Sequence, residues 1–273
     1  MQASRSYYAG IDAGSTYTKG ALVDDRGNIV GTAVDMTGVN IVTASKKIYG
    51  LLLDKTGMNE SDVAYVVGTG YGRYRITFGN TQVTEISCHA KGAHLLYPNT
   101  HTVLDMGGQD TKAIRVNAHG EVMDFSMNDK CAAGTGRFIE GSARVLGLKL
   151  QEVGELSLRS TNPVKISSTC AVFAETETQE QLAWGHSLED VLYGIHASMA
   201  TRAIGLLRRV GIEPEITFTG GVSMNPGMIR ALEEQLGQRL NHDGKTMYCG
   251  AIGAAIFALE RASSATHEGG SAA

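Results

Sequence analysis

Two segments of the chain align with each other without a gap. Residues 8–23 read YAGIDAGSTYTKGALV, and residues 101–116 read HTVLDMGGQDTKAIRV. Each segment predicts a strand, a tight glycine turn, a second strand and a glycine-containing hairpin into a third strand. The matching residues are Asp12 with Asp105, Gly14 with Gly107, Thr18 with Thr111, Lys19 with Lys112 and, in the hairpin, Gly27 with Gly120. Agreement over more than one turn favours a duplicated domain over a chance similarity of two strands.

Strands and helices alternate in both halves of the sequence, which predicts an α/β fold of two domains facing across a cleft. We assign residues 1–97 to the first domain, which a helix of small residues at 250–262 completes, and residues 98–249 to the second domain. Residues 263–273 read SSATHEGGSAA and are predicted to be a disordered tail.

Composition excludes several classes of function. The 273 residues carry a net charge of −4 and contain no run of lysine and arginine, which argues against binding nucleic acid. No apolar segment has the length of a signal peptide or a membrane span, so we expect a cytoplasmic protein that does not enter a membrane. The four cysteines are too few and too scattered for a disulfide framework.

The two aligned glycine turns have the chemistry of a nucleotide site. Each follows an acidic residue, Asp12 or Asp105, at the end of a buried strand. Glycines let backbone N–H groups reach phosphate oxygens, the hydroxyls of Ser15 and Thr16 add donors, and the carboxylates suit hydrated Mg²⁺. A third glycine turn, FTGGVSMN at 218–225, weakens the alternative that these are only structural hairpins. The sequence has no Walker loop and no complete dinucleotide fingerprint.

Two cysteines stand in unusual settings. Cys131 lies in MNDKCAAGTGRFIE and Cys170 in SSTCAVFAETE, each before a predicted helix and each without a second cysteine two or three residues away. A lone cysteine of this kind is usually a buried small hydrophobe. A zinc site within one chain would need Cys88 and Cys249 as well, but their settings favour structural roles. His89 and His94 flank an apolar stretch, and we expect them to pack or to form local hydrogen bonds rather than to bind a metal.

The motifs resemble those of known ATPases. IDAGSTYTKG, LDMGGQDTK and FTGGVSMN are similar to the two phosphate motifs and the adenosine motif of the superfamily that contains sugar kinases, actin and the heat-shock chaperone ATPases. Together with VTEISCHAKGA and the two cysteine motifs, they resemble more closely the ATP-dependent activators of 2-hydroxyacyl-CoA dehydratases and the ATPase subunits of benzoyl-CoA reductases. The resemblance implies two ribonuclease H-like, actin-like ATPase domains and covers the chain to about residue 261.

The resemblance also implies a nucleotide site. The residues expected to contact ATP or ADP are Gly14, Ser15, Thr16, Gly107, Gly108, Gln109, Gly220, Gly221 and Val222. Asp12 and Asp105 are expected to organise Mg²⁺ through water. By analogy with glutamines in other nucleotide hydrolases, Gln109 is expected to position the attacking water.

For the cysteines, the resemblance implies a 4Fe-4S cluster. Cys131 and Cys170 of two subunits would together ligate one cluster per dimer, because a cubane cluster takes four thiolates. The pair of subunits is either a homodimer or a heterodimer with a homologous chain. The N–H groups of the helices that follow the cysteines would stabilise the anionic cluster.

The implied activity is ATP-driven transfer of one electron. A donor such as ferredoxin or flavodoxin would supply the electron, and a dehydratase or reductase component acting on a CoA thioester would accept it. One alternative is a small-molecule kinase of the same fold with Asp110 as its base, and another is a nucleotide-dependent interaction module without a cluster. The sequence leaves open the CoA ester, the donor, the choice between dehydratase and benzoyl-CoA reductase, and the composition of the dimer.

Overall fold

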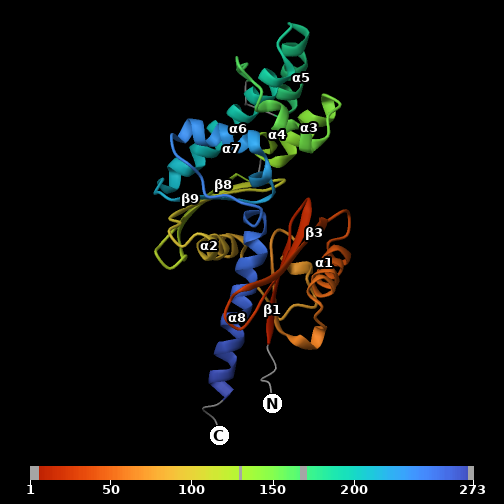
Figure 1. The fold of residues 1–273 in the computed structure, drawn as a ribbon, viewed down its shortest axis with the longest axis vertical. Coiled ribbons are helices and arrows are strands. Elements are labelled where there is room, and N and C mark those ends of the chain that lie inside the picture. Colours follow the sequence, from red (N-terminus) through yellow and green to blue (C-terminus); the bar gives the residue numbers. More distant parts are fainter. Residues whose placement is uncertain (1–5, 129–130, 167–170, 270–273) are drawn as a thin grey trace. The chain divides into compact units, whose positions relative to one another are not determined.

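The computed structural model describes residues 6–128, 131–166 and 171–269. The chain divides into two compact units (Figure 1). Unit 1 contains residues 1–98, 118–122 and 248–273, and unit 2 contains residues 99–117 and 123–247. The short turn 118–122 therefore joins unit 1, whereas the sequence analysis assigned it to the second domain. Packing explains its place, since a Cβ atom added at Gly120 would lie only 2.7 Å from the Cβ atom of His94 in unit 1.

Unit 1 is built on a five-stranded sheet in the order β3-β2-β1-β4-β5. The strand β1 pairs antiparallel with β2 and parallel with β4. The strands are β1 (Tyr7–Ala13), β2 (Tyr17–Val23), β3 (Ile29–Met36), β4 (Val63–Thr69) and β5 (Thr81–Gln82), and the helices are α1 (Ile41–Thr56), α2 (Glu85–Leu96) and α8 (Cys249–Gly269). Short 3₁₀ turns lie at Glu60–Asp62 and Arg73–Arg75.

Both faces of the unit 1 sheet are covered. Alternate residues of β1 point to opposite faces, so that Tyr8 packs with α8 while Ala9 and Ile11 pack with α1. A strand that is buried on both sides needs a nearly continuous apolar run, which explains the sequence YYAGIDA of β1.

The helix α8 approaches α2 and β1 closely because glycines line the contacts. A Cβ atom at Gly92 would lie 2.1 Å from the carbonyl oxygen of Cys249, and one at Gly253 would lie 1.9 Å from that of Cys88. Both cysteines are fully buried here, in keeping with structural roles, and burial raises the pKa of the Cys88 thiol to about 12.

The helix α8 is longer than the sequence analysis expected. It continues through residues 263–269, which we had assigned to a disordered tail. The hydroxyl of Ser263 donates to the carbonyl of Leu259, and that of Ser264 donates to the carbonyl of Glu260. Both side chains therefore bond to the preceding turn of the helix. Residues 270–273 lie outside the described residues.

Unit 2 is built on a four-stranded sheet in the order β8-β7-β6-β9. The strand β6 pairs antiparallel with β7 and parallel with β9. The strands are β6 (Thr102–Met106), β7 (Thr111–Val116), β8 (Val122–Asn128) and β9 (Ile216–Thr219), and the helices are α3 (Gly136–Val145), α4 (Leu150–Ser157), α5 (Ala171–Ala183), α6 (Leu188–Val210) and α7 (Pro226–Leu236). Three 3₁₀ turns, η3 (Ala132–Gly134), η4 (Gly221–Met224) and η5 (Thr246–Tyr248), connect them.

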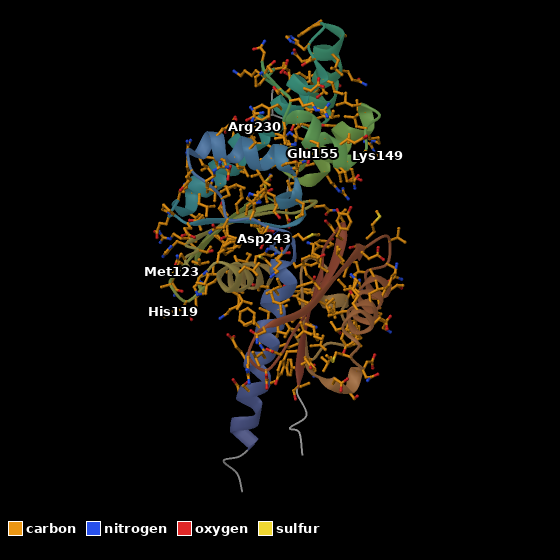
Figure 2. The ribbon with its side chains drawn as sticks, in the orientation of Figure 1. His119, Met123, Lys149, Glu155, Arg230 and Asp243 are labelled. Carbon is orange, nitrogen blue, oxygen red and sulfur yellow. The ribbon has the colours of Figure 1, made fainter. Side chains whose placement is uncertain are left out.

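The long helix α6 forms the centre of the unit 2 core, where its buried face packs with α4, α7 and the sheet. At the edge of this packing, the guanidinium of Arg230 on α7 (Figure 2) lies 4.6 Å from the ring centroid of Tyr193 and 2.8 Å from the carboxylate of Glu234. Within the described ranges, no helix is both long and apolar enough to span a membrane.

The duplicated domain predicted from the sequence is confirmed. The first four strands of each sheet follow the same order, β3-β2-β1-β4 in unit 1 and β8-β7-β6-β9 in unit 2. The register is also repeated, since Asp12 pairs across strands with Lys19 and Asp105 pairs with Lys112. Each pair flanks one of the two glycine turns.

His196 makes the stability of unit 2 depend on pH. This α6 residue is completely buried, and burial lowers the pKa of its imidazole from 6.5 to about 4. Below pH 6.5 the unfolded chain therefore binds a proton at this residue that the folded chain does not bind. As the pH falls further, the free energy of unfolding decreases by about 1.4 kcal/mol per pH unit until the pH reaches the folded pKa. We expect His196 to lower the free energy of unfolding by about 2 kcal/mol between pH 7.5 and pH 5.

Urea unfolding at pH 7.5 and pH 5 measures this effect. The His196→Leu variant is expected to lose less stability than the wild type between pH 7.5 and pH 5. The matched control is His186→Leu, at an exposed residue, which should lose as much stability as the wild type. An equal pH dependence in wild type and His196→Leu would show that this imidazole binds its proton equally well in the folded and the unfolded chain.

Candidate functional site

The first glycine turn joins β1 to β2 and is held by threonines. The N–H of Gly14 donates to the carbonyl of Asp12 over 3.1 Å, and the hydroxyl of Thr37 donates to the carbonyl of Gly14 over 2.7 Å. The N–H of Thr37 also donates to the carbonyl of Thr16 over 2.9 Å. The side chains of Ser15 and Thr16 stay partly exposed, so their hydroxyls are accessible to a ligand.

The second glycine turn joins β6 to β7 and is closed by its own backbone. The N–H of Gly107 donates to the carbonyl of Asp110 over 2.9 Å. Gly108 and Gln109 at the tip are partly exposed. The tip of the closed turn, with Gln109, is therefore accessible from outside.

A buried lysine accompanies the carboxylate at each turn. The Lys19 Nζ atom lies 3.5 Å from Oδ2 of Asp12 in unit 1, and the Lys112 Nζ atom lies 3.2 Å from Oδ2 of Asp105 in unit 2. Lys112 also lies 2.9 Å from Oδ1 of Asp110. A buried carboxylate is costly without a charged partner, so these pairs let acidic groups remain at the turns.

Lys19 and Lys112 align in the duplicated segments, but no function was predicted for them from the sequence. The signal was present, because an aspartate and a lysine seven positions apart flank both tight turns. In an antiparallel hairpin of this length the two side chains lie opposite each other.

A glycine with positive φ also accompanies each carboxylate. Gly220 follows β9 with φ of 86°, and a Cβ atom there would lie 2.5 Å from Oδ1 of Asp105. Gly70 follows β4 with φ of 88°, and its Cβ atom would lie 2.4 Å from Oδ1 of Asp12. The sequence motifs predicted that Gly220 contacts the nucleotide, but they gave no role to Gly70, which is its counterpart in the duplicated fold.

The third turn lies beside the second one. Gly221 and Val222 begin η4, and a Cβ atom at Gly220 would lie 2.4 Å from the carbonyl oxygen of Met106. Unit 2 thus brings Asp105, the second glycine turn and the third turn together. Asp12 and the first turn belong to unit 1.

Cys131 is the N-terminal cap of η3, three positions after the last residue of β8, and is partly exposed. Its carbonyl accepts a 3.0 Å hydrogen bond from Nδ2 of Asn128. The side chain lines a pocket of about 350 Å³ together with residues of α6, among them Arg202 and Arg209. The thiol is therefore accessible rather than part of the core, unlike those of Cys88 and Cys249.

The segment after Cys131 is hydrogen-bonded directly to the second glycine turn. The N–H groups of Gly136 and Arg137 donate to the carbonyls of Gly107 and Gly108, both over 2.9 Å. The hydroxyl of Thr111 donates to the carbonyl of Gly134 over 2.6 Å. Three hydrogen bonds thus join the cysteine segment to this turn.

This arrangement corrects one expectation. We expected a helix to begin at Cys131 and to direct its first N–H groups at a cluster. The helix α3 begins only at Gly136, and its first two N–H groups are used by the second turn. Cys170 lies outside the described residues, and α5 begins at Ala171.

The candidate metal ligands that the structure describes do not form a site within one chain. Among the described residues, no three His, Cys, Asp or Glu side chains gather around a position that could hold a metal ion. Cys131 belongs to unit 2, whereas Cys88 and Cys249 belong to unit 1.

The fold with its paired turns is that of the sugar kinase and actin class. A ROK family glucokinase from Streptomyces griseus, solved with glucose and AMPPNP, shares it with a TM-score of 0.60 at 12% identity, over 93% of this chain and 99% of the other. Within that class, the chain belongs to the BadF/BadG/BcrA/BcrD ATPase family, whose model matches residues 9–258.

Two relatives within the family are similar over almost their whole length. The (R)-2-hydroxyglutaryl-CoA dehydratase activating ATPase of Acidaminococcus fermentans is 44% identical, over 94% of this chain and 98% of its own. The activator of the 2-hydroxyisocaproyl-CoA dehydratase from Clostridium difficile, solved with bound ADPNP, is 38% identical with a TM-score of 0.90, over 96% of this chain and 97% of its own.

Proposed function

We propose that this ATPase is an activator that uses ATP hydrolysis to transfer one electron to a partner dehydratase acting on a 2-hydroxyacyl-CoA thioester. The observation that carries the proposal is the set of hydrogen bonds from Gly136, Arg137 and Thr111 that joins the second glycine turn to the Cys131 segment. Such a link gives a nucleotide a direct mechanical connection to a redox-active cysteine. The two activator relatives support the same assignment.

Both glycine turns contribute to nucleotide binding in this proposal. Backbone N–H groups of the turns bind phosphate oxygens, and the hydroxyls of Ser15 and Thr16 add donors. The turn at Gly220, Gly221 and Val222 contributes to the nucleoside end.

The carboxylates of Asp12 and Asp105 organise Mg²⁺ through its water ligands. Each carboxylate is already paired with a lysine, Lys19 or Lys112. That pairing fits a water-mediated role better than direct coordination, because Mg²⁺ keeps several waters in most nucleotide sites.

Cys131 and Cys170 of two subunits hold a 4Fe-4S cluster, which supplies the low-potential electron when it is bound. The fit to such a cluster rests on three features of Cys131: it is partly exposed, it belongs to no complete metal site among the described residues, and it shares its pocket with Arg202, whose Nε atom is buried. A half-site of this kind is completed by a second subunit related by a two-fold axis. The second subunit is another copy of this chain or a homologue.

The partners follow from this chemistry. The electron donor is a low-potential protein such as ferredoxin or flavodoxin, and the acceptor is a dehydratase component. A benzoyl-CoA reductase component is the runner-up acceptor. We place the protein in the cytoplasm, where reducing conditions suit the reduced cysteines Cys88 and Cys249.

The kinase alternative is weakened by Asp110. A catalytic base must be free to accept a proton from an acceptor hydroxyl. The Asp110 carboxylate instead lies 2.9 Å from the buried Nζ atom of Lys112 and is held by it.

Purification without oxygen tests the proposal. We expect a brown protein that contains iron and inorganic sulfide in equal amounts, close to four of each per dimer. It should release phosphate from MgATP without any added acceptor hydroxyl. A colourless, iron-free protein that phosphorylates a small molecule would be a kinase, and an iron-free protein that binds ATP without turnover would be an interaction module.

A further inference from the structure

Arg202 stands in the pocket that Cys131 lines, in a place where an arginine normally has an acidic partner. It lies on α6, and its stem passes beside η3, since a Cβ atom at Gly134 would lie 3.8 Å from both Cβ and Cδ of Arg202. The described residues that line the pocket include Thr111, Asn128, Cys131 and Arg209 beside Arg202. None of the described lining residues is an aspartate or a glutamate.

The guanidinium of Arg202 has an unused donor. Its Nε atom is buried and makes no hydrogen bond in the part of the chain that the structure describes. Three other arginines of unit 2 have acidic partners, Arg115 with Glu213, Arg230 with Glu234 and Arg239 with Glu233. A buried N–H group without an acceptor costs free energy, so its retention in a pocket indicates an anionic acceptor that is supplied from elsewhere.

We propose that Arg202 is a positioning residue that directs its positive charge and its Nε–H donor at the cluster held by Cys131, and thereby raises the reduction potential of that cluster. This inference rests on the proposed function. Four thiolates give a cluster a net negative charge, and hydrogen bonds to its sulfurs are among the factors that set its potential. A guanidinium stays protonated at every accessible pH, so its effect is constant.

The direction of the effect follows from the charge balance. Reduction adds one electron to the cluster, breaks no bond and increases its negative charge by one. A nearby positive charge stabilises the reduced form more than the oxidised form. Removal of the charge of Arg202 should therefore make reduction harder.

The test is the midpoint potential of the anaerobically purified protein, titrated with dithionite and followed by electron paramagnetic resonance. At a fixed applied potential, Arg202→Gln is expected to lower the ratio of reduced to oxidised cluster about tenfold, which corresponds to about 59 mV for one electron. Arg202→Lys keeps the charge but loses the Nε–H donor, and roughly a threefold fall is expected. The matched control is Arg208→Gln, an exposed α6 residue outside the pocket lining, whose potential should equal that of the wild type.

Iron content is measured for every variant, so that loss of the cluster is distinguished from a change in its potential. If Arg202→Gln retains its iron but has the potential of Arg208→Gln, the inference is wrong while the proposed function stands. If Arg202→Gln does not retain iron, the test uses Arg202→Lys instead. A ratio of reduced to oxidised cluster in Arg202→Lys that equals the wild-type ratio overturns the inference. A wild-type protein without iron and sulfide overturns the proposed function and this inference with it.

Discussion

The Cys131→Ala variant is expected to lose its iron and inorganic sulfide and to dimerise more weakly. In a homodimer this single change removes two of the four thiolates at once, and the remaining pair cannot hold a cubane cluster. Because the cluster would join the two subunits, its loss also removes part of the interface free energy. Iron and sulfide analysis after anaerobic reconstitution measures the first effect, and sedimentation measures the second.

Cys88→Ala is the matched control. Cys88 is fully buried in unit 1 against Gly253 of α8, so its replacement removes packing but no ligand. This variant should keep its cluster and its dimer, whereas Cys170→Ala should behave like Cys131→Ala. Full iron content in Cys131→Ala would rule out this residue as a ligand.

The Gln109→Ala variant is expected to separate nucleotide binding from hydrolysis. Most phosphate contacts in a glycine turn come from the backbone, so affinity for a non-hydrolysable ATP analogue should change little. Hydrolysis should slow by roughly 100-fold or more, because the attacking water loses the side chain that orients it. Calorimetry measures the binding, and phosphate release measures the turnover.

The same variant should still respond to ATP at its cluster. Binding would continue to shift the conformation, while the reset by hydrolysis would be blocked. We therefore expect the ATP-induced change in the electron paramagnetic resonance signal to persist without repeated electron delivery. If Gln109→Ala hydrolyses ATP at the wild-type rate, Gln109 does not position the attacking water. If ATP does not change the cluster signal of the wild type, the nucleotide and the cluster are not coupled.

The coupling has a specific structural element that can be broken separately. Thr111 is buried, and its hydroxyl donates to the carbonyl of Gly134. Thr111→Val keeps the shape of the side chain but removes this hydrogen bond, so the cluster signal should respond less to ATP while Gln109 remains in place to support hydrolysis. Thr111→Ser, which keeps the hydroxyl, is the control and should respond like the wild type. An unchanged response in Thr111→Val would mean that the bonds from Gly136 and Arg137 suffice.

The connection between the second glycine turn and Cys131 is shorter in the fold than along the chain. Along the chain, the second glycine turn reaches Cys131 only through β7, the hairpin at Gly120 and β8. In the fold, the N–H groups of Gly136 and Arg137 return to the turn and make the connection direct. No local pattern encodes these bonds, because they join residues almost thirty positions apart whose approach depends on how α3 packs into the core of unit 2.

The sequence alone determined the duplication, the class of fold and the family. Internal repeats and turn glycines are local signals, and each has a local physical cause: apolar residues for buried strands, and glycine where the backbone needs a positive φ or a close approach. The alignment of Asp12 with Asp105 and of Lys19 with Lys112 followed from the same signals.

Only the tertiary structure decided what those residues contact. It paired each aspartate with a lysine, placed Gly70 and Gly220 against the two carboxylates, and continued α8 through residues that resemble a disordered tail. It also placed Arg202, more than seventy positions along the chain, in the pocket that Cys131 lines. Contacts of this kind arise when distant elements pack together, and a sequence pattern with a period of two or 3.6 residues carries no information about them.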